Sequence, residues 1–404
     1  MQKKILLCWN YERKNWVSQF EEILDPGSYV FINYFSKALE KTNSTGEQVL
    51  YWNDFRSVDH LLDETGPSKV IFMGLDSPYV FLLNKACRER KIPTFFLQHG
   101  IFHSYRAYRY EEKSMRSLTA GKPGHSINNR DLPPRDNRFF WHSFKLRRLA
   151  LYYRIIKFQL VKKYLHSAQR ALKSVASPVL QPDHYIVYTR YLSNIFIERD
   201  GVDPGRMIEI GNEEANKLIL AIQNREGYSY TSGEYYLFID EAFTGADEFL
   251  LPPIVPTDQY NHFLLSLSAF ARSKGKRLMV KLHPFSYNVD HFVKDDNIDY
   301  VRQADFETII GNACGVFGFS STLLIPAAFV KPACFFRLNG FSDIHKALEE
   351  MQYCKVLDFR RFSTGEIVFS EQVTAAQQAE YIRYFLYKLD DKCQQRLADI
   401  IRDK

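Results

Sequence analysis

Three short polar clusters in the second half of the chain carry side chains suited to acid–base chemistry and phosphate binding. They are the adjacent carboxylates Asp240 and Glu241, the pair His283 and Pro284, and the hydroxyl run 320–322. A carboxylate accepts a proton or attacks carbon, histidine stabilises charge on a departing phosphate, and hydroxyls at a helix start bind phosphate. Each cluster alone also has an ordinary structural interpretation, as a solvated strand end, a core histidine or a helix cap.

Each cluster comes at the end of an apolar run that is typical of a buried strand. The runs are 235–239, 278–282 and 315–319. Ligands of open α/β sheets bind beyond the carboxyl ends of the strands, and Pro284 fixes the chain so that His283 is directed there. We expect a helix to begin at residue 320, with the hydroxyl run at its N-terminus.

The rest of the chain alternates strand-like and helix-like segments. Further strands are expected at 4–8, 29–32, 49–52, 70–73, 94–97, 184–189, 207–210 and 333–336, and helices at 78–89, 261–272, 306–312 and from about 374 to the end. This alternation predicts βαβ units with parallel sheets, an α/β fold. A chain of 404 residues suits two domains. We predict domains at 1–182, with a basic helical insertion at about 138–173, and at 183–404, with a terminal helix.

The order of an acidic motif, a His-Pro motif and a Ser/Thr motif resembles the bacterial CMP-sugar glycosyltransferases. These include sialyl- and polysialyltransferases and the Kdo transferases of capsule and O-antigen assembly. The resemblance covers residues 235–336 and implies a GT-B fold, with two Rossmann-like domains facing a central cleft. It also implies transfer of Kdo or a nonulosonic acid such as sialic acid from a CMP-sugar to a bacterial surface glycan, in O-antigen, capsule or lipooligosaccharide.

The resemblance assigns roles residue by residue. Asp240 matches the catalytic carboxylate with Glu241 beside it, and His283 matches the histidine that contacts the donor phosphate. The residues implied to hold that phosphate with His283 are Lys281, Pro284, Ser320, Ser321 and Thr322. Ala242 stands where the acidic motif of sialyltransferases usually has glycine, which leaves both inversion and retention open.

A turn in the first half, Gln98-His99-Gly100, follows the expected strand 94–97. It resembles turns of capsule and teichoic-acid glycosyltransferases that face the acceptor side of the cleft. Gly100 permits a tight turn that presents Gln98 and His99. A purely structural turn is the alternative.

Several function classes lack their sequence signatures. The chain has no D-x-D triplet, which favours a transferase that needs no metal or other cofactor. It has no phosphate-loop motif and no G-x-G-x-x-G motif, which disfavours NTPases and dehydrogenases. Its six cysteines show no C-x-x-C spacing, which disfavours a zinc site.

The net charge of +6 is concentrated in one segment. No acidic residue occurs between 137 and 182, where the cations are Arg138, Lys145, Arg147, Arg148, Arg154, Lys157, Lys162, Lys163, Arg170 and Lys173. Apolar residues recur there at helical spacing. The segment is either a helical surface for an anionic membrane or a solvated helical face. Because the chain has no long apolar run, we expect a cytoplasmic protein. If the segment binds an anionic membrane, the protein is peripheral on the inner face of the inner membrane.

Two other functions remain open. The first is a GT-B transferase with another donor, such as CDP-glycerol or a UDP-sugar. The second is a non-catalytic protein that binds glycan or nucleic acid on a transferase fold. The leading interpretation has a CMP-sugar donor, a glycan or lipid-linked glycan acceptor and no nucleic-acid partner.

Overall fold

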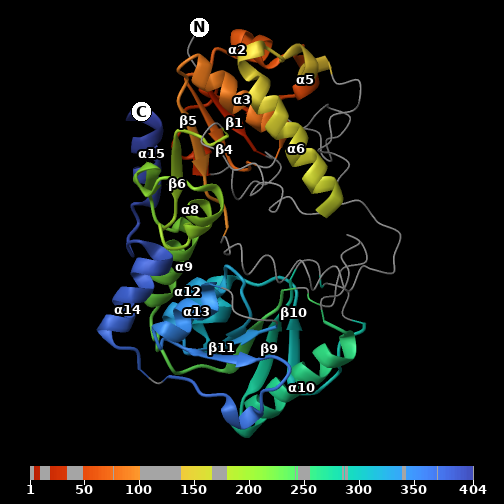
Figure 1. The fold of residues 1–404 in the computed structure, drawn as a ribbon. Coiled ribbons are helices and arrows are strands. Elements are labelled where there is room, and N and C mark those ends of the chain that lie inside the picture. Colours follow the sequence, from red (N-terminus) through yellow and green to blue (C-terminus); the bar gives the residue numbers. More distant parts are fainter. Residues whose placement is uncertain are drawn as a thin grey trace. The chain divides into compact units, whose positions relative to one another are not determined.

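The computed structural model describes residues 4–9, 19–33, 49–75, 77–100, 138–165, 180–241, 243, 255–283, 286, 290–338, 343–370 and 372–403. The chain divides into two compact units (Figure 1). Among the described residues, unit 1 comprises those between 4 and 100, between 138 and 210 and from 392 to 403, and unit 2 comprises those between 211 and 391.

The described part of unit 1 contains a sheet of seven parallel strands in the order β3-β2-β1-β4-β5-β6-β7. The strands are β1 (Ile5–Cys8), β2 (Tyr29–Ile32), β3 (Val49–Leu50), β4 (Lys69–Phe72), β5 (Thr94–Leu97), β6 (His184–Val187) and β7 (Met207–Glu209). The central strands β1, β4 and β5 are buried along their whole length. Continuous apolar runs form such strands because both faces of a parallel sheet are covered.

Helices cover this sheet in unit 1. They are α2 (Val58–Thr65), α3 (Pro78–Glu89), α5 (Arg138–His142), α6 (Leu149–Leu165), α8 (Asn194–Asp200) and α15 (Cys393–Asp403), with 3-10 turns at Trp52–Asp54, Leu146–Arg148 and Pro204–Arg206. The Ser77 hydroxyl caps α3 by accepting the Tyr79 N–H at 3.3 Å. Helix α6 lies beside α3 (Figure 1), and the rings of Phe81 and Phe158 meet there.

The described part of unit 2 contains six parallel strands in the order β10-β9-β8-β11-β12-β13. They are β8 (Tyr235–Ile239), β9 (Arg277–Lys281), β10 (Ile298–Val301), β11 (Ala313–Gly318), β12 (Ala333–Arg337) and β13 (Lys355–Asp358). The helices are α9 (Glu213–Gln223), α10 (Thr257–Ser273), α11 (Phe306–Gly311), α12 (Leu324–Val330), α13 (Asp343–Glu350) and α14 (Ala375–Tyr381), with a 3-10 turn at Thr364–Glu366 and a π turn at Ile382–Leu386.

Both sheets share one topology. Each begins at a central strand, builds outward for three strands and then continues on the other side of the first strand. The chain therefore reverses direction across the sheet between β1 and β4 in unit 1 and between β8 and β11 in unit 2. Such reversal points open a crevice at the carboxyl edge of an α/β sheet. The predicted α/β class with two Rossmann-like parts is confirmed.

The division between the two parts differs from the expected one after residue 182. Strands β6 and β7 continue the unit 1 sheet, because β6 pairs with β5 and β7 pairs with β6. Unit 1 therefore extends to residue 210 and also includes the chain end from 392.

The single terminal helix expected from about residue 374 is wrong. Helix α14 runs into a π turn, Tyr387 has a φ of 66°, and α15 begins only at Cys393. Helix α15 packs on unit 1 through Leu397 and Ile401, and the Arg396 guanidinium donates to the Ile210 carbonyl at 2.7 Å. The helix is interrupted because α14 belongs to unit 2 and α15 to unit 1, so the two helices bury their apolar faces in different units.

Two strands were not expected, the edge strands β10 and β13. Their sequences, Ile-Asp-Tyr-Val and Lys-Val-Leu-Asp, mix polar and apolar residues and are less buried than the central strands. None of the described helices is long and apolar enough to cross a bilayer.

Candidate functional site

The three polar clusters of unit 2 lie at the ends of three neighbouring strands. Asp240 and Glu241 follow β8, His283 follows β9, and Ser320 follows β11, in the strand order β9-β8-β11. The register aligns Ile239 with Lys281 and therefore brings the ends of β8 and β9 to the same level. The fold thus brings the expected residues to one edge of one sheet.

Asp240 is buried, with 3% of its surface exposed, and holds the end of β9 in place. Its Oδ1 accepts a hydrogen bond from the Tyr260 hydroxyl on α10, and its Oδ2 accepts the His283 backbone N–H at 3.1 Å. Burial and the neighbouring Asp240 charge raise the pKa of Tyr260, which keeps that hydroxyl a donor. In this arrangement Asp240 positions the backbone of His283.

Glu241 reaches across the reversal point between β8 and β11. Its Oε1 accepts the backbone N–H groups of Ser320 at 2.5 Å and Ser321 at 2.6 Å, and its Oε2 accepts the Ser320 hydroxyl at 3.0 Å. Burial raises the pKa of Glu241 to about 7, although these hydrogen bonds oppose the shift, and the charge of Asp240 raises it further. A carboxylate with a pKa in this range exchanges protons readily near neutral pH.

The Ser320–Ser321 turn is an anion-binding arrangement, since consecutive backbone N–H groups point at one acceptor. The expected helix start at residue 320 is wrong, because α12 begins at Leu324 and its N-cap has no side-chain hydrogen bond. Glu241 holds the amides of Ser320 and Ser321 outside the helix, and Thr322 is exposed in the same turn. The N–H groups that donate to Glu241 therefore belong to a turn and not to a helix end.

His345 is a supporting residue that sequence reasoning missed. Its Nε2 lies 2.7 Å from the carbonyl oxygen of Phe319, the residue before Ser320, and the side chain is buried. His345 belongs to α13, so the contact links β11 to a helix that follows the next strand. Nothing local in the sequence signals this contact.

His283 is half-buried and Lys281 is buried. Burial lowers the pKa of His283, the Asp240 charge opposes this and the Lys281 charge reinforces it. The imidazole is then largely neutral at neutral pH, with one ring N–H to donate. The Lys281 ammonium donates to the Leu282 carbonyl at 2.7 Å and lies 5.5 Å from the ring centre of Phe306, so part of its donor capacity is used internally. Pro284 lies outside the described residues.

In unit 1, the Gln98-His99-Gly100 turn follows β5 as expected, but Gln98 does not face solvent. Its surface is 1% exposed, and its Oε1 accepts the Tyr188 N–H at 2.9 Å and the Ser193 hydroxyl at 2.7 Å. Gly100 has a φ of 65°, the left-handed conformation that the turn requires. The expectation that Gln98 is presented to a ligand is therefore wrong.

His99 in the same turn has a partly exposed side chain. Its ring lies 4.4 Å from the ring of Trp9, centre to centre, and Trp9 follows β1. An aromatic and an imidazole ring thus lie together at the carboxyl edge of the unit 1 sheet. Such ring faces pack on the apolar faces of ligands.

Several cations of the basic segment form ion pairs within unit 1. Arg148 is fully buried and pairs with Asp59 at 2.9 Å and Glu89 at 2.7 Å. Lys145 also pairs with Asp59, and Arg147 with Glu89. Although burial alone would raise it, hydrogen bonds from Arg148 and Lys145 hold the pKa of Asp59 well below its usual range. The network ties α2 and α3 to the 3-10 turn Leu146–Arg148 that precedes α6.

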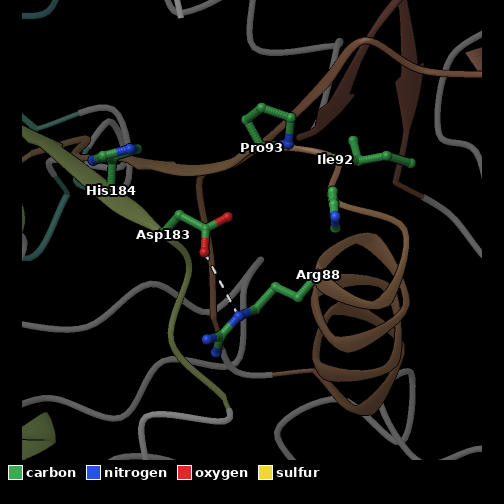
Figure 2. Close-up of a pocket in the computed structure, with 6 residues that line it drawn as sticks. Arg88, Ile92, Pro93, Asp183 and His184 are labelled. Carbon is green, nitrogen blue, oxygen red and sulfur yellow. Dashed lines mark ion pairs between the residues drawn. The ribbon is translucent and has the colours of Figure 1, made fainter.

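A cavity of about 300 Å³ in unit 1 lies away from these residues. It is lined by Arg88, Lys91, Ile92, Pro93, Asp183 and His184. Figure 2 shows Asp183 facing Arg88, with Nε and Oδ1 3.6 Å apart. The cavity lies at the amino ends of β5 and β6, whereas ligands of such sheets bind at the carboxyl ends.

The sequence matches no protein-family model, and no curated protein matches it. The solved structure of the calicheamicin glycosyltransferase CalG4 is similar over 100% of this chain and 98% of its own, with a TM-score of 0.50 and 10% identity. A UDP-N-acetylglucosamine 2-epimerase from Rickettsia bellii is similar over 100% and 97%, with a TM-score of 0.49 and 11% identity. The wall teichoic acid polymerase TagF is similar over 100% and 89%, with a TM-score of 0.46 and 14% identity. The likeness to CalG4, with the two parallel sheets of one strand order, shows that this chain has the GT-B fold.

Proposed function

We propose that the chain is a glycosyltransferase whose nucleotide-sugar donor binds at the carboxyl edge of unit 2. One observation supports this most strongly. The acidic pair, His283 and the Ser320–Ser321 turn form a hydrogen-bonded network across three neighbouring strand ends, at the reversal point of the sheet. This is where an α/β sheet binds its ligand.

The donor phosphate takes the place of the Glu241 carboxylate on the turn. Both groups present oxygen acceptors with negative charge, and the two N–H groups and the Ser320 hydroxyl already point at one such acceptor. His283 donates its ring N–H to the same phosphate and stabilises its charge when the nucleotide leaves. Lys281 adds a positive charge close by.

Glu241, once displaced, serves as the general base. It takes the proton of the acceptor hydroxyl while the acceptor oxygen bonds to the anomeric carbon and the bond from that carbon to the phosphate oxygen breaks. Asp240 holds the His283 backbone. The competing assignment gives the attacking or proton-accepting role to Asp240.

The donor we propose is a CMP-sugar carrying a 2-keto-3-deoxy sugar acid, Kdo or a nonulosonic acid such as sialic acid. The acceptor is a bacterial surface glycan, free or lipid-linked, and the reaction takes place in the cytoplasm without a metal. His99 beside Trp9 is the described part of unit 1 that we assign to the acceptor.

Thermal-shift measurements with CMP, CDP and UDP test the donor class, because a ligand of the folded state raises the melting temperature. We expect CMP to give the largest shift, and incubation with CMP-Kdo or CMP-sialic acid to give a product of the corresponding mass. A larger shift with CDP or UDP, or transfer from CDP-glycerol or a UDP-sugar, would show that the donor is not a CMP-sugar. No nucleotide response and no turnover would favour a non-catalytic glycan-binding protein.

A further inference from the structure

The outer side of α5, α6 and the turn between them is unusually apolar for a surface. Leu146 is 81% exposed, Tyr153 is 68% exposed and Trp141 is 55% exposed. Of the large hydrophobic residues that are exposed in the described part of the chain, most fall between 141 and 160. Scattered exposed apolar residues are normal, whereas a contiguous set marks an interaction surface.

The spacing in α6 shows that this surface is a continuous stripe. Leu149, Tyr153, Ile156 and Leu160 are all exposed and follow at intervals of four, three and four residues, which places them on one face of the helix. Trp141 and Phe144 precede the helix and are also exposed. We call these residues, with Leu146, the outer face.

The outer face is not part of the described core of unit 1. Helix α6 already buries a second apolar stripe, Leu151, Tyr152, Ile155 and Phe158, in the core that it shares with α3. Figure 1 shows α6 lying beside α3, and the buried stripe faces the core that they share. A helix that is apolar on the side away from its own core requires another explanation.

The charge around the outer face is positive. Arg138 and Lys157 are exposed, and Lys157 lies one turn beyond Tyr153 on the same side of α6. A hollow of about 630 Å³ on this side is lined by Leu149, Ala150, Tyr153, Arg154 and Lys157. No acidic residue occurs from 137 to 182, so nothing in the local sequence opposes an anionic partner.

We propose that the outer face binds the surface of a bilayer that contains anionic lipid. The leucine, isoleucine and aromatic side chains enter the boundary between head groups and acyl chains, and the cations contact the anionic head groups. Helix α6 lies along the surface and does not cross it, because Arg154, Lys157, Lys162 and Lys163 interrupt its apolar sequence. A symmetric pair of two copies would set this positive face against itself, which disfavours self-association.

Vesicle flotation of the full chain tests the proposal and needs no donor, so its result is independent of the transfer reaction. We compare vesicles of phosphatidylcholine alone with vesicles that also contain phosphatidylglycerol. The wild type should float with the anionic vesicles, and less so at high salt. The double variant L149Q/I156Q should lower the bound fraction about tenfold, since both lost side chains bury apolar surface in the interface. K157E should lower it as well.

Leu265→Gln is the matched control, because Leu265 is an exposed leucine on a helix of unit 2. It should bind vesicles like the wild type, and circular dichroism checks that every variant is folded. Equal binding by wild type and L149Q/I156Q, or no binding to anionic vesicles at low salt, overturns the proposal. A wild-type dimer that becomes monomeric in L149Q/I156Q, with no vesicle binding, identifies a second copy as the occupant instead.

Discussion

Asp59 in unit 1 and Glu241 in unit 2 are both carboxylates held by several donors, yet their pKa values shift in opposite directions. Asp59 meets the buried guanidinium of Arg148 and the ammonium of Lys145, and its pKa falls despite burial. Among the described residues, the hydrogen-bond donors to Glu241 are neutral N–H and O–H groups, and Glu241 lies beside Asp240, so burial raises its pKa to about 7. The first carboxylate is part of the framework, and the second remains able to change charge near neutral pH.

The carboxyl edges of the two sheets also differ, in the residues that they carry. They share a strand order, but the reversal point of unit 2 holds Glu241 against two backbone N–H groups, whereas the edge of unit 1 holds the rings of Trp9 and His99. Topology provides the crevice, and the residues after each strand decide which ligand fits it. Our proposal therefore assigns the donor phosphate to unit 2 and a sugar ring face to unit 1.

The largest effect is expected from Arg148→Met. Removing one partner of a buried ion network leaves Asp59 and Glu89 without their main counter-charge and costs about 3–5 kcal/mol. Urea unfolding should show this loss. The control is Arg147→Met, whose side chain is 58% exposed and whose loss costs about 1 kcal/mol or less. Equal losses of stability in the two variants would contradict the structural role that we assign to the ion pairs of Asp59.

Glu241→Gln should lower turnover by about 100-fold or more, because the general base is lost. Nucleotide affinity, measured by calorimetry with CMP, should stay the same or rise, since the neutral amide competes less well for the serine N–H groups. Asp240→Asn should instead lower both turnover and nucleotide affinity, because it weakens the hydrogen bond that holds the His283 backbone. Normal turnover in E241Q together with dead D240N would assign the base to Asp240.

The pH dependence of stability separates the two carboxylates further. In the folded state Glu241 has a pKa of about 7, against 4.5 when unfolded, so between these values the folded state binds more protons. Its contribution is then fully present below pH 4.5 and is lost as the pH rises toward 7. Melting curves of the wild type and E241Q should diverge over this range, by up to roughly 3 kcal/mol in favour of E241Q. Parallel curves would contradict the raised pKa.

The smallest effects come from the hydroxyl run. Ser320→Ala removes the hydroxyl that donates to Glu241 and should weaken CMP binding by about 1 kcal/mol, several-fold. Thr322→Ala should change it by less than about twofold, because Thr322 is exposed and none of the described residues receives a hydrogen bond from its hydroxyl. The reverse ranking would show that the phosphate lies nearer the start of α12.

Local pattern predicted the buried strands well. Strands at 29–32, 94–97 and 235–239 and the helix at 78–89 occur with the expected bounds, because each is a compact apolar run or has a clear cap. The edge strand β10 was missed because its polar residues resemble a loop. The break between α14 and α15 was missed because helix propensity continues through a point where the chain changes units.

The sequence by itself determined that acidic, histidine and hydroxyl residues follow strands, because strand ends are set by nearby residues. Only the tertiary structure decided what those residues contact. Glu241 and Ser320 are 79 positions apart, and their hydrogen bonds exist because β8 and β11 are neighbours. The same holds for the burial of Gln98 and Arg148 and for the exposure of the outer face, since burial and charge pairing depend on contacts between distant segments.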